Sequence, residues 1–147
     1  MKTTGIKNYI YATGRRREAV ARVRLYSAGK AQLDGKELKK GDIFVNGKPV
    51  TEYFNFFAFA PAYNKLFIDT DTAGKYIFTI RVVGGGLYGQ LDASVLGMAR
   101  ALDKLDPEKF HSTLRTKGYL TRDPRIRERR KVGMGGKARR KKQSPKR

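Results

Sequence analysis

Alternating apolar and polar residues predict two strands near the start of the chain. Within residues 8–13 and 18–26, successive side chains change sides, so that Ala21 and Val23 share one face. A period of two is typical of a half-buried β-strand. The residues between these segments, Gly14-Arg15-Arg16-Arg17, are predicted to form the turn of a hairpin.

The second half of the domain changes to a helical period. The clearest strand is Lys75–Val83, and it leads through the glycine-rich run GGGLYG at residues 84–89 into the clearest helix. That helix is predicted from apolar residues at helical spacing, namely Leu91, Val95, Met98, Leu102 and Leu105. Asp106 and Pro107 have the residue types of a helix N-cap and first helical position, and Gly118 is the expected end of this second helix.

The middle of the chain gives weaker signals. Lys30–Leu33 and Ile43–Val45 are predicted to be short strands, and Pro49–Tyr53 and Pro61–Phe67 short helical segments. The stretch Tyr53–Phe67 holds seven aromatic residues, for which core packing is favoured over base stacking because only one residue there is basic. Strands followed by helices predict an α+β fold, in which helices pack on one face of a sheet.

Composition changes this picture by adding an appendage. The 147 residues carry 33 Lys+Arg and 13 Asp+Glu, a formal charge of +20. Residues 112–147 alone hold 15 Lys/Arg and two acids, a net +13, and few apolar residues follow Leu120. Such a segment buries too little surface to offset its ordering entropy. We therefore predict a globular domain at residues 1–118 and an extended basic C-terminal tail at residues 119–147.

Several classes of function receive no support from the residues present. The chain has no Cys and a single His, which excludes thiolate chemistry and multi-histidine metal clusters. No pair of acids has the spacing of a metal or acid–base site in an apolar stretch, so no catalytic residue, metal or cofactor is predicted. No apolar run approaches the length of a membrane helix, and the first residues lack the apolar core of a signal peptide. The prediction is a cytoplasmic protein that is not an enzyme.

The positive charge favours a nucleic-acid partner. Arg15, Arg16 and Arg17, with Arg22 and Arg24, place five arginines within ten residues, and the planar guanidinium suits phosphate. The tail is expected to follow a phosphate backbone and to release counterions. The run GGGLYG is open to two interpretations, phosphate contact or close strand-to-helix packing, and it lacks the Lys-Ser or Lys-Thr ending of a P-loop.

Four ordered segments resemble the small-ribosomal-subunit protein S9 family in its bacterial form. They are YATGRRREAVARV at residues 11–23, NGKPVTEYF at 46–54, VVGGGLYGQLDASVLGMARAL at 82–102, and the tail from Gly118 with its LTRDPR run and terminal Lys-Arg. The resemblance covers nearly the whole chain. It departs from the family at DGKELKKGD (residues 34–42), which is extra length, at Val95-Leu96, where the family often has a basic pair, and at Ser144-Pro145, where it often has Phe-Ser.

The resemblance implies a fold like domain 2 of ribosomal protein S5, with a mixed sheet and a left-handed βαβ unit. It implies a structural role in the head of the small ribosomal subunit, beside neighbouring head proteins and without homo-oligomers. It implies P-site tRNA contact, on the anticodon stem, by Lys146 and Arg147. The predicted rRNA-binding residues are Arg15, Arg16, Arg17, Arg22, Arg24, Gly85, Gly86, Gln90, Arg122, Arg125, Arg129, Arg130, Lys131, Lys137, Arg139 and Arg140.

Two alternatives of other classes remain open at this point. A DNA-binding or nucleoid protein would also be basic, but no helix-turn-helix or basic-zipper pattern is present. A phosphotransferase would need nucleotide binding at Gly84–Gly89, because related folds include small-molecule kinases with a glycine-rich phosphate loop. Copurification with rRNA would favour the ribosomal hypothesis over the first alternative, and an ATP titration would test the second.

Overall fold

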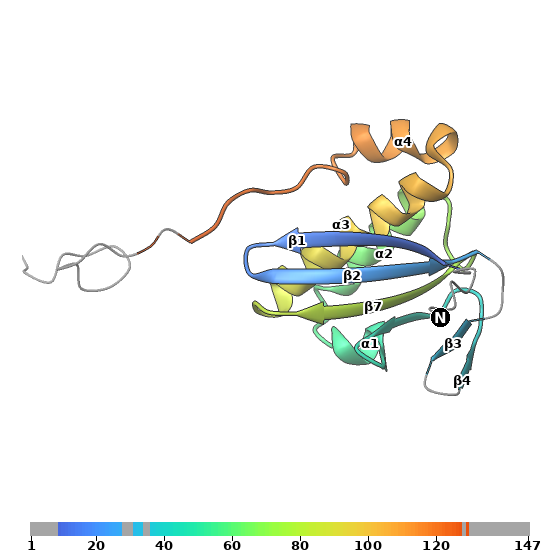
Figure 1. Cartoon of the computed structure of the whole chain (residues 1–147), viewed down its shortest axis with the longest axis horizontal. Helices are drawn as coiled ribbons and strands as arrows, with labels where there is room; N and C mark the ends of the chain where they lie inside the picture. The colour runs from blue at the N-terminus through green and yellow to red at the C-terminus, as the bar shows by residue number, and fades with distance from the viewer. Residues whose placement is uncertain (1–8, 28–30, 34–35, 128, 130–147) are drawn as a thin grey trace, which may run out of the picture.

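The computed structural model of the chain describes residues 9–27, 31–33, 36–127 and 129, and two sheets and four helices lie in these ranges (Figure 1). A small sheet pairs β3 (Ala31–Leu33) with β4 (Lys36–Leu38). The main sheet has five strands, in the spatial order β1 (Ile10–Arg16), β2 (Ala19–Tyr26), β7 (Ile77–Val83), β5 (Ile43–Val45) and β6 (Lys48–Pro49).

The main sheet is mixed, as the resemblance implies. All of its neighbouring strands pair antiparallel except β5 and β7, which run parallel to each other. The described helices are α1 (Val50–Tyr53), α2 (Ala60–Asp69), α3 (Leu87–Leu105) and α4 (Pro107–Thr116). Figure 1 shows α2 and α3 behind the sheet, so that one face of the sheet is covered by helices.

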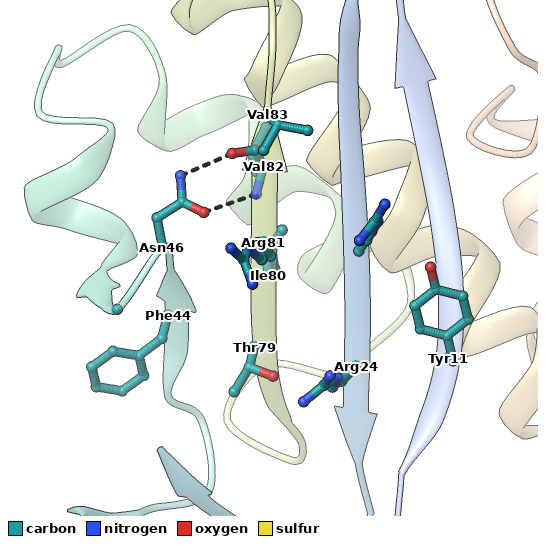
Figure 2. Close-up of a pocket in the computed structure, with 11 residues that line it drawn as sticks. Tyr11, Arg24, Phe44, Asn46, Thr79, Ile80, Arg81, Val82 and Val83 are labelled. Carbon is teal, nitrogen blue, oxygen red and sulfur yellow. Dashed lines mark hydrogen bonds between the residues drawn. The ribbon is translucent and has the colours of Figure 1, made fainter. Parts of the chain in front are cut away.

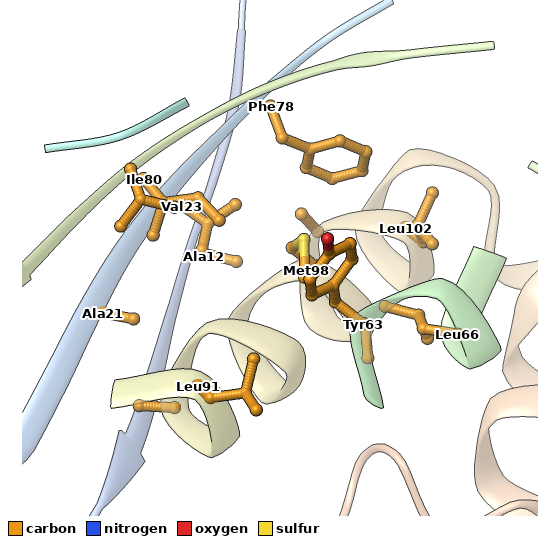
Figure 3. Packing of buried hydrophobic residues seen from close by; sticks show 14 of the residues in the cluster. Ala12, Ala21, Val23, Tyr63, Leu66, Phe78, Ile80, Leu91, Met98 and Leu102 are labelled. Atoms are coloured by element: carbon orange, nitrogen blue, oxygen red, sulfur yellow. The ribbon is translucent and has the colours of Figure 1, made fainter. Parts of the chain in front are cut away.

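The core lies between the covered face of the sheet and α3. Val23 on β2 and Phe78 on β7 are in one buried cluster with Met98 and Leu102 of α3 (Figure 3). The approach of β1 to α3 depends on glycine, because a Cβ at Gly14 would overlap the backbone carbonyl oxygen of Ala93. This contact fixes the hairpin against the first half of α3.

The hairpin turn is shorter than predicted. Gly14, Arg15 and Arg16 do not belong to the turn, because they continue β1 and pair with β2 down to Arg16 opposite Ala19. Only Arg17 and Glu18 connect the strands, and Arg17 adopts a positive φ of 50°. The prediction was wrong because Gly14 serves the close approach to α3 rather than the turn.

The end of the domain follows the predicted signals. The Asp106 side chain accepts a hydrogen bond from the Lys109 backbone N–H at 3.2 Å, and Gly118 follows α4 with a φ of 78°. The Tyr119 hydroxyl then donates to Asp69 at 2.7 Å. Burial and this neighbouring carboxylate raise the pKa of Tyr119 to about 12. Leu120 also packs against the core, so the chain stays in contact with the domain beyond Gly118.

The aromatic middle segment divides into two groups. Phe54, Phe59, Tyr63 and Phe67 are buried, which agrees with the packing interpretation. Phe57, in contrast, is 82% exposed, and the tilted ring of Phe56 lies beside it at 4.7 Å between ring centroids. Packing therefore explains most, and not all, of this stretch.

Candidate nucleic-acid interface

The three arginines of the hairpin have different surroundings. Arg15 and Arg17 are exposed. Arg16 keeps only 13% of its side chain exposed and lies between two carboxylates, with Nε 3.3 Å from Asp92 and a terminal nitrogen 2.6 Å from Asp123. Because Asp92 belongs to α3 and Asp123 to the start of the tail, Arg16 joins three parts of the chain. Among the described residues, no carboxylate forms an ion pair with Arg15 or Arg17.

Asp123 also binds Arg125, two residues further along the tail. Its carboxylate accepts hydrogen bonds from the Arg125 backbone N–H at 2.9 Å and from the guanidinium at 2.6–3.0 Å. These hydrogen bonds, and next the charges of Arg125 and Arg16, hold the pKa of Asp123 well below its usual range. The Arg125 side chain nevertheless stays 79% exposed, so it presents part of its guanidinium outward.

The glycine-rich loop between β7 and α3 has the conformation that only glycine adopts readily. Gly84 and Gly85 have φ values of 75° and 65°, in the left-handed region that favours glycine. A Cβ on Gly84 would overlap the backbone oxygen of Glu18 in the hairpin turn. Close packing thus explains why residue 84 is glycine. At Gly86, in contrast, a Cβ would meet no other atom, so the main chain there is open to solvent.

A series of side-chain hydrogen bonds connects this loop to β7, α1 and the end of β5. Asn46, after β5, binds the backbone N–H and C=O of Val82 at 2.9 and 3.0 Å and so extends the pairing with β7. Its amide also donates to the Tyr53 hydroxyl at 3.1 Å. Tyr53 donates to Gln90, whose amide donates to the Gly84 carbonyl. The side chain of Gln90, a predicted rRNA contact, is therefore directed to the loop itself.

Hairpin, glycine loop and tail meet around one surface hollow of about 530 Å³. Its lining includes Arg17 and Glu18 from the hairpin, Gly85 and Gly86 from the loop, Asp92 from α3, and Arg127 from the chain after α4. Asp92 is paired with Arg16. These segments are distant in sequence. The structure thus brings two arginines and the exposed main chain of two glycines to one hollow.

Arg22 and Arg24 lie elsewhere, on the face of the sheet that α3 does not cover. In the strand register Arg22 is opposite Arg81 of β7, and Arg24 is opposite Tyr11 of β1. These side chains line a second hollow of about 610 Å³ (Figure 2). The predicted arginines therefore form two surfaces, one at the hairpin tip and one on the open sheet.

Other kinds of site find little support in the described ranges. There, no three His, Asp or Glu side chains gather as metal ligands would. None of the helices in those ranges has the length and apolar composition needed to span a membrane.

Comparison with known proteins decides between the remaining alternatives. The sequence model of the family described as "Ribosomal protein S9/S16" matches residues 14–147. Small ribosomal subunit protein uS9 of Trichormus variabilis and that of Nostoc sp. are each 44% identical over 125 residues, 84% of this chain and 82% of theirs. The protein of the same name from Synechocystis sp. has the same identity and coverage.

The chain belongs to the ribosomal protein S9 family. As a family member it is a structural, rRNA-binding component of the small ribosomal subunit and not an enzyme. The phosphotransferase alternative is therefore wrong. Gln90-Leu91 after the loop agrees with this, since a P-loop has Lys followed by Ser or Thr at these two positions. The nucleoid alternative is excluded by the same membership.

Of the predicted tail, only residues 119–127 and 129, its root, belong to the described residues. Arg122, Arg125, Arg127 and Arg129 are exposed there. The other predicted tail contacts lie outside the described residues, namely Arg130, Lys131, Lys137, Arg139, Arg140, Lys146 and Arg147.

Sequence reasoning missed four residues that line or support these two candidate surfaces. Asn46 and Tyr53 lay inside the quoted NGKPVTEYF segment, yet their hydrogen bonds to β7 and Gln90 need the tertiary fold. Tyr11 and Arg81 had a usable signal, because each lies on the polar side of an alternating strand. Only the strand register shows that they share a face with Arg22 and Arg24.

Proposed function

We propose that the hairpin tip, the glycine loop and the root of the tail form one rRNA-binding surface in the head of the small subunit. The observation that carries this proposal is the hollow where Arg17, Gly85, Gly86 and Arg127 meet. Exposed guanidinium groups and main-chain N–H groups bind phosphate without reading sequence, which suits a structural role. The contacts proposed here are Arg15, Arg17, Gly85, Gly86, Arg122, Arg125, Arg127 and Arg129.

Arg16 has a different part in the same proposal. Its guanidinium already pairs with Asp92 and Asp123, so it holds the hairpin against α3 and the root of the tail. The RNA contacts are made by Arg15 and Arg17. Gln90 likewise acts through the loop that it holds, by its hydrogen bond to the Gly84 carbonyl. Both remain in the predicted binding region, with the direct phosphate contacts assigned to their neighbours.

The experiment that tests this surface measures the salt dependence of rRNA binding. Replacing Arg15 and Arg17 by Gln in the full chain should lower the slope of log K against log salt by about 0.7–0.9 for each phosphate that is no longer neutralised. The matched control replaces the exposed Lys65 and Arg115, on α2 and α4, by Gln and removes the same charge. Equal slopes for the two double variants, with both folded, would overturn the proposed surface.

We further propose that the rest of the tail reaches P-site tRNA. Twenty-nine residues follow Gly118, and they span roughly 95 Å when fully extended. The cations continue to Lys146 and Arg147 at the last two positions, and the resemblance to the S9 family points to the anticodon stem as the polyanion they meet. Along the way, Arg130, Lys131, Lys137, Arg139 and Arg140 would follow rRNA.

The family relationship also supports the finer fold and location. We infer a fold of the ribosomal protein S5 domain 2 type, a place beside other head proteins, and work on the ribosome in the cytoplasm. The parallel β5–β7 pair, joined through α1 and α2, is compatible with the βαβ unit of that fold. Superposing an experimental structure of the subunit head would test the fold and identify the neighbours together.

A further inference from the structure

The open face of the main sheet, the one that α3 does not cover, carries both a small apolar cluster and a hollow. Inward side chains of β2 and β7 pack on α3, and no described helix covers the outward ones. At one end of this face, Leu38 of β4 and Ile77 form a small buried cluster against which Tyr26 and Phe44 pack. The other end stays open as the hollow of about 610 Å³.

The charge on this face is unbalanced. Arg22 and Arg81 are directly opposite each other on neighbouring antiparallel strands, an arrangement that destabilises a sheet. Among the residues that the structure describes, no acid forms an ion pair with Arg22, Arg24 or Arg81, and none lines the hollow. A polyanion is the partner that neutralises such a cluster.

Aromatic rings lie in line with these cations. Tyr11 on β1, Arg24 on β2, Thr79 on β7 and Phe44 on β5 form one row across the sheet by register, and Figure 2 shows them side by side. Tyr11 is 45% exposed. The Arg24 guanidinium is held 4.9 Å from the ring centroid of Tyr9, which favours a fixed position.

An exposed aromatic ring beside arginines favours unpaired RNA over an RNA duplex. A duplex hides its bases and presents phosphates and 2′-hydroxyls, for which cations suffice. Unpaired bases stack on exposed aromatic rings while nearby arginines hold their phosphates. The second row, in which Arg22 and Arg81 lie beside Asn46, adds two phosphate contacts next to the ring of Tyr11.

We propose that the open face of the sheet binds an unpaired segment of ribosomal RNA, with a base stacked on Tyr11 and phosphates held by Arg22, Arg24 and Arg81. This deepens the proposed function and rests on it, since the ligand is the rRNA of the subunit. It adds two contacts, Tyr11 and Arg81, to the predicted set. It also separates this single-strand site from the phosphate surface at the hairpin tip.

The first experiment titrates the full chain with a short oligouridylate and with an RNA duplex of equal length. Tyr11→Leu removes the ring and no charge, so oligouridylate affinity should fall about 5-fold or more with an unchanged salt slope. Arg81→Gln should lower that slope by about 0.7. Lys65→Gln, which removes one exposed charge from α2, is the control. Duplex affinity should be unaffected by Tyr11→Leu.

A second experiment locates the contact despite the basic tail. Photo-crosslinking of a 4-thiouridine oligonucleotide to the full chain, followed by peptide mass spectrometry, should modify the peptide that holds Tyr11. Crosslinks confined to the tail, or unchanged oligouridylate binding by both folded variants, would overturn the proposal. An equal loss of duplex binding in Tyr11→Leu would overturn the single-strand mode.

The two proposals fail in different ways. If Arg15→Gln/Arg17→Gln lowers the salt slope for rRNA while Tyr11→Leu and Arg81→Gln change nothing, the hairpin surface stands and the sheet site is wrong. If neither set changes binding, the proposed rRNA surface is wrong as well. Urea unfolding of each variant shows that the fold is intact.

Discussion

The two faces of β2 show how one strand serves two purposes. Ala19, Ala21, Val23 and Leu25 point toward α3 and are fully buried, whereas the residues between them, including Arg22 and Arg24, face outward. The inward residues hold the domain together by removing apolar surface from water. The outward arginines add charge that the fold itself does not need, since Arg22 is opposite Arg81. Stability and binding are therefore expected to separate along this strand.

The largest expected effect tests that separation directly. Leu25→Ala removes a side chain with 0% exposure from the core and should lower the free energy of unfolding by about 2–5 kcal/mol, as measured by urea denaturation. The substitution Arg24→Ala, at the outward-facing neighbour of Leu25, should change the free energy of unfolding by only about 0.5 kcal/mol. A comparable loss of stability in both variants would break the comparison.

A second, smaller effect concerns the last two cations of the sequence, Lys146 and Arg147. Removing Lys146 and Arg147 should leave assembly intact and speed P-site tRNA release from purified small subunits several-fold, since each charge contributes about 1 kcal/mol. Removing everything after Leu120 should impair assembly as well, because the tail would no longer bind rRNA. Unchanged tRNA release by both truncated chains, at normal protein occupancy, would leave the tail without a role at the tRNA.

The smallest effect separates structural arginines from binding arginines. Asp123→Asn removes the carboxylate shared by Arg16 and Arg125, so the backbone N–H of Arg125 should exchange with solvent faster while the core amides of β2 do not. The wild-type contact should persist at neutral pH, because the pKa of Asp123 is lowered in the folded chain. It should weaken only when the pH falls well below about 4, the ordinary pKa of Asp, because the folded carboxylate stays ionised until then.

Hydrogen exchange followed by NMR measures both parts of this prediction. Asp71→Asn is the matched control, because Asp71 pairs with Lys75 on a distant turn and also has a lowered pKa. Identical exchange at Arg125 in the wild type and in Asp123→Asn would show that the ion pairs do not hold the root of the tail.

The strands and long helices could be predicted because their residues repeat with the period of the element that they form. The α3 stripe from Leu91 to Leu102 and the Asp106 cap are such local signals, and both are present in the structure. The hairpin turn was placed wrongly because Gly14 has two possible uses, and only the position of α3 decides between them.

The amino-acid sequence by itself determined the α+β class, the division of charge between domain and tail, and the family, because each depends on residue type and order along the chain. Tertiary structure alone decided which arginines of the described residues form ion pairs with carboxylates and which do not. Arg16 is bound because Asp92 and Asp123, far away in sequence, meet at its side chain. Arg22, Arg24, Arg81 and Tyr11 share one face because the register of three strands aligns them. Charge interactions depend on distance through space, and the fold sets that distance.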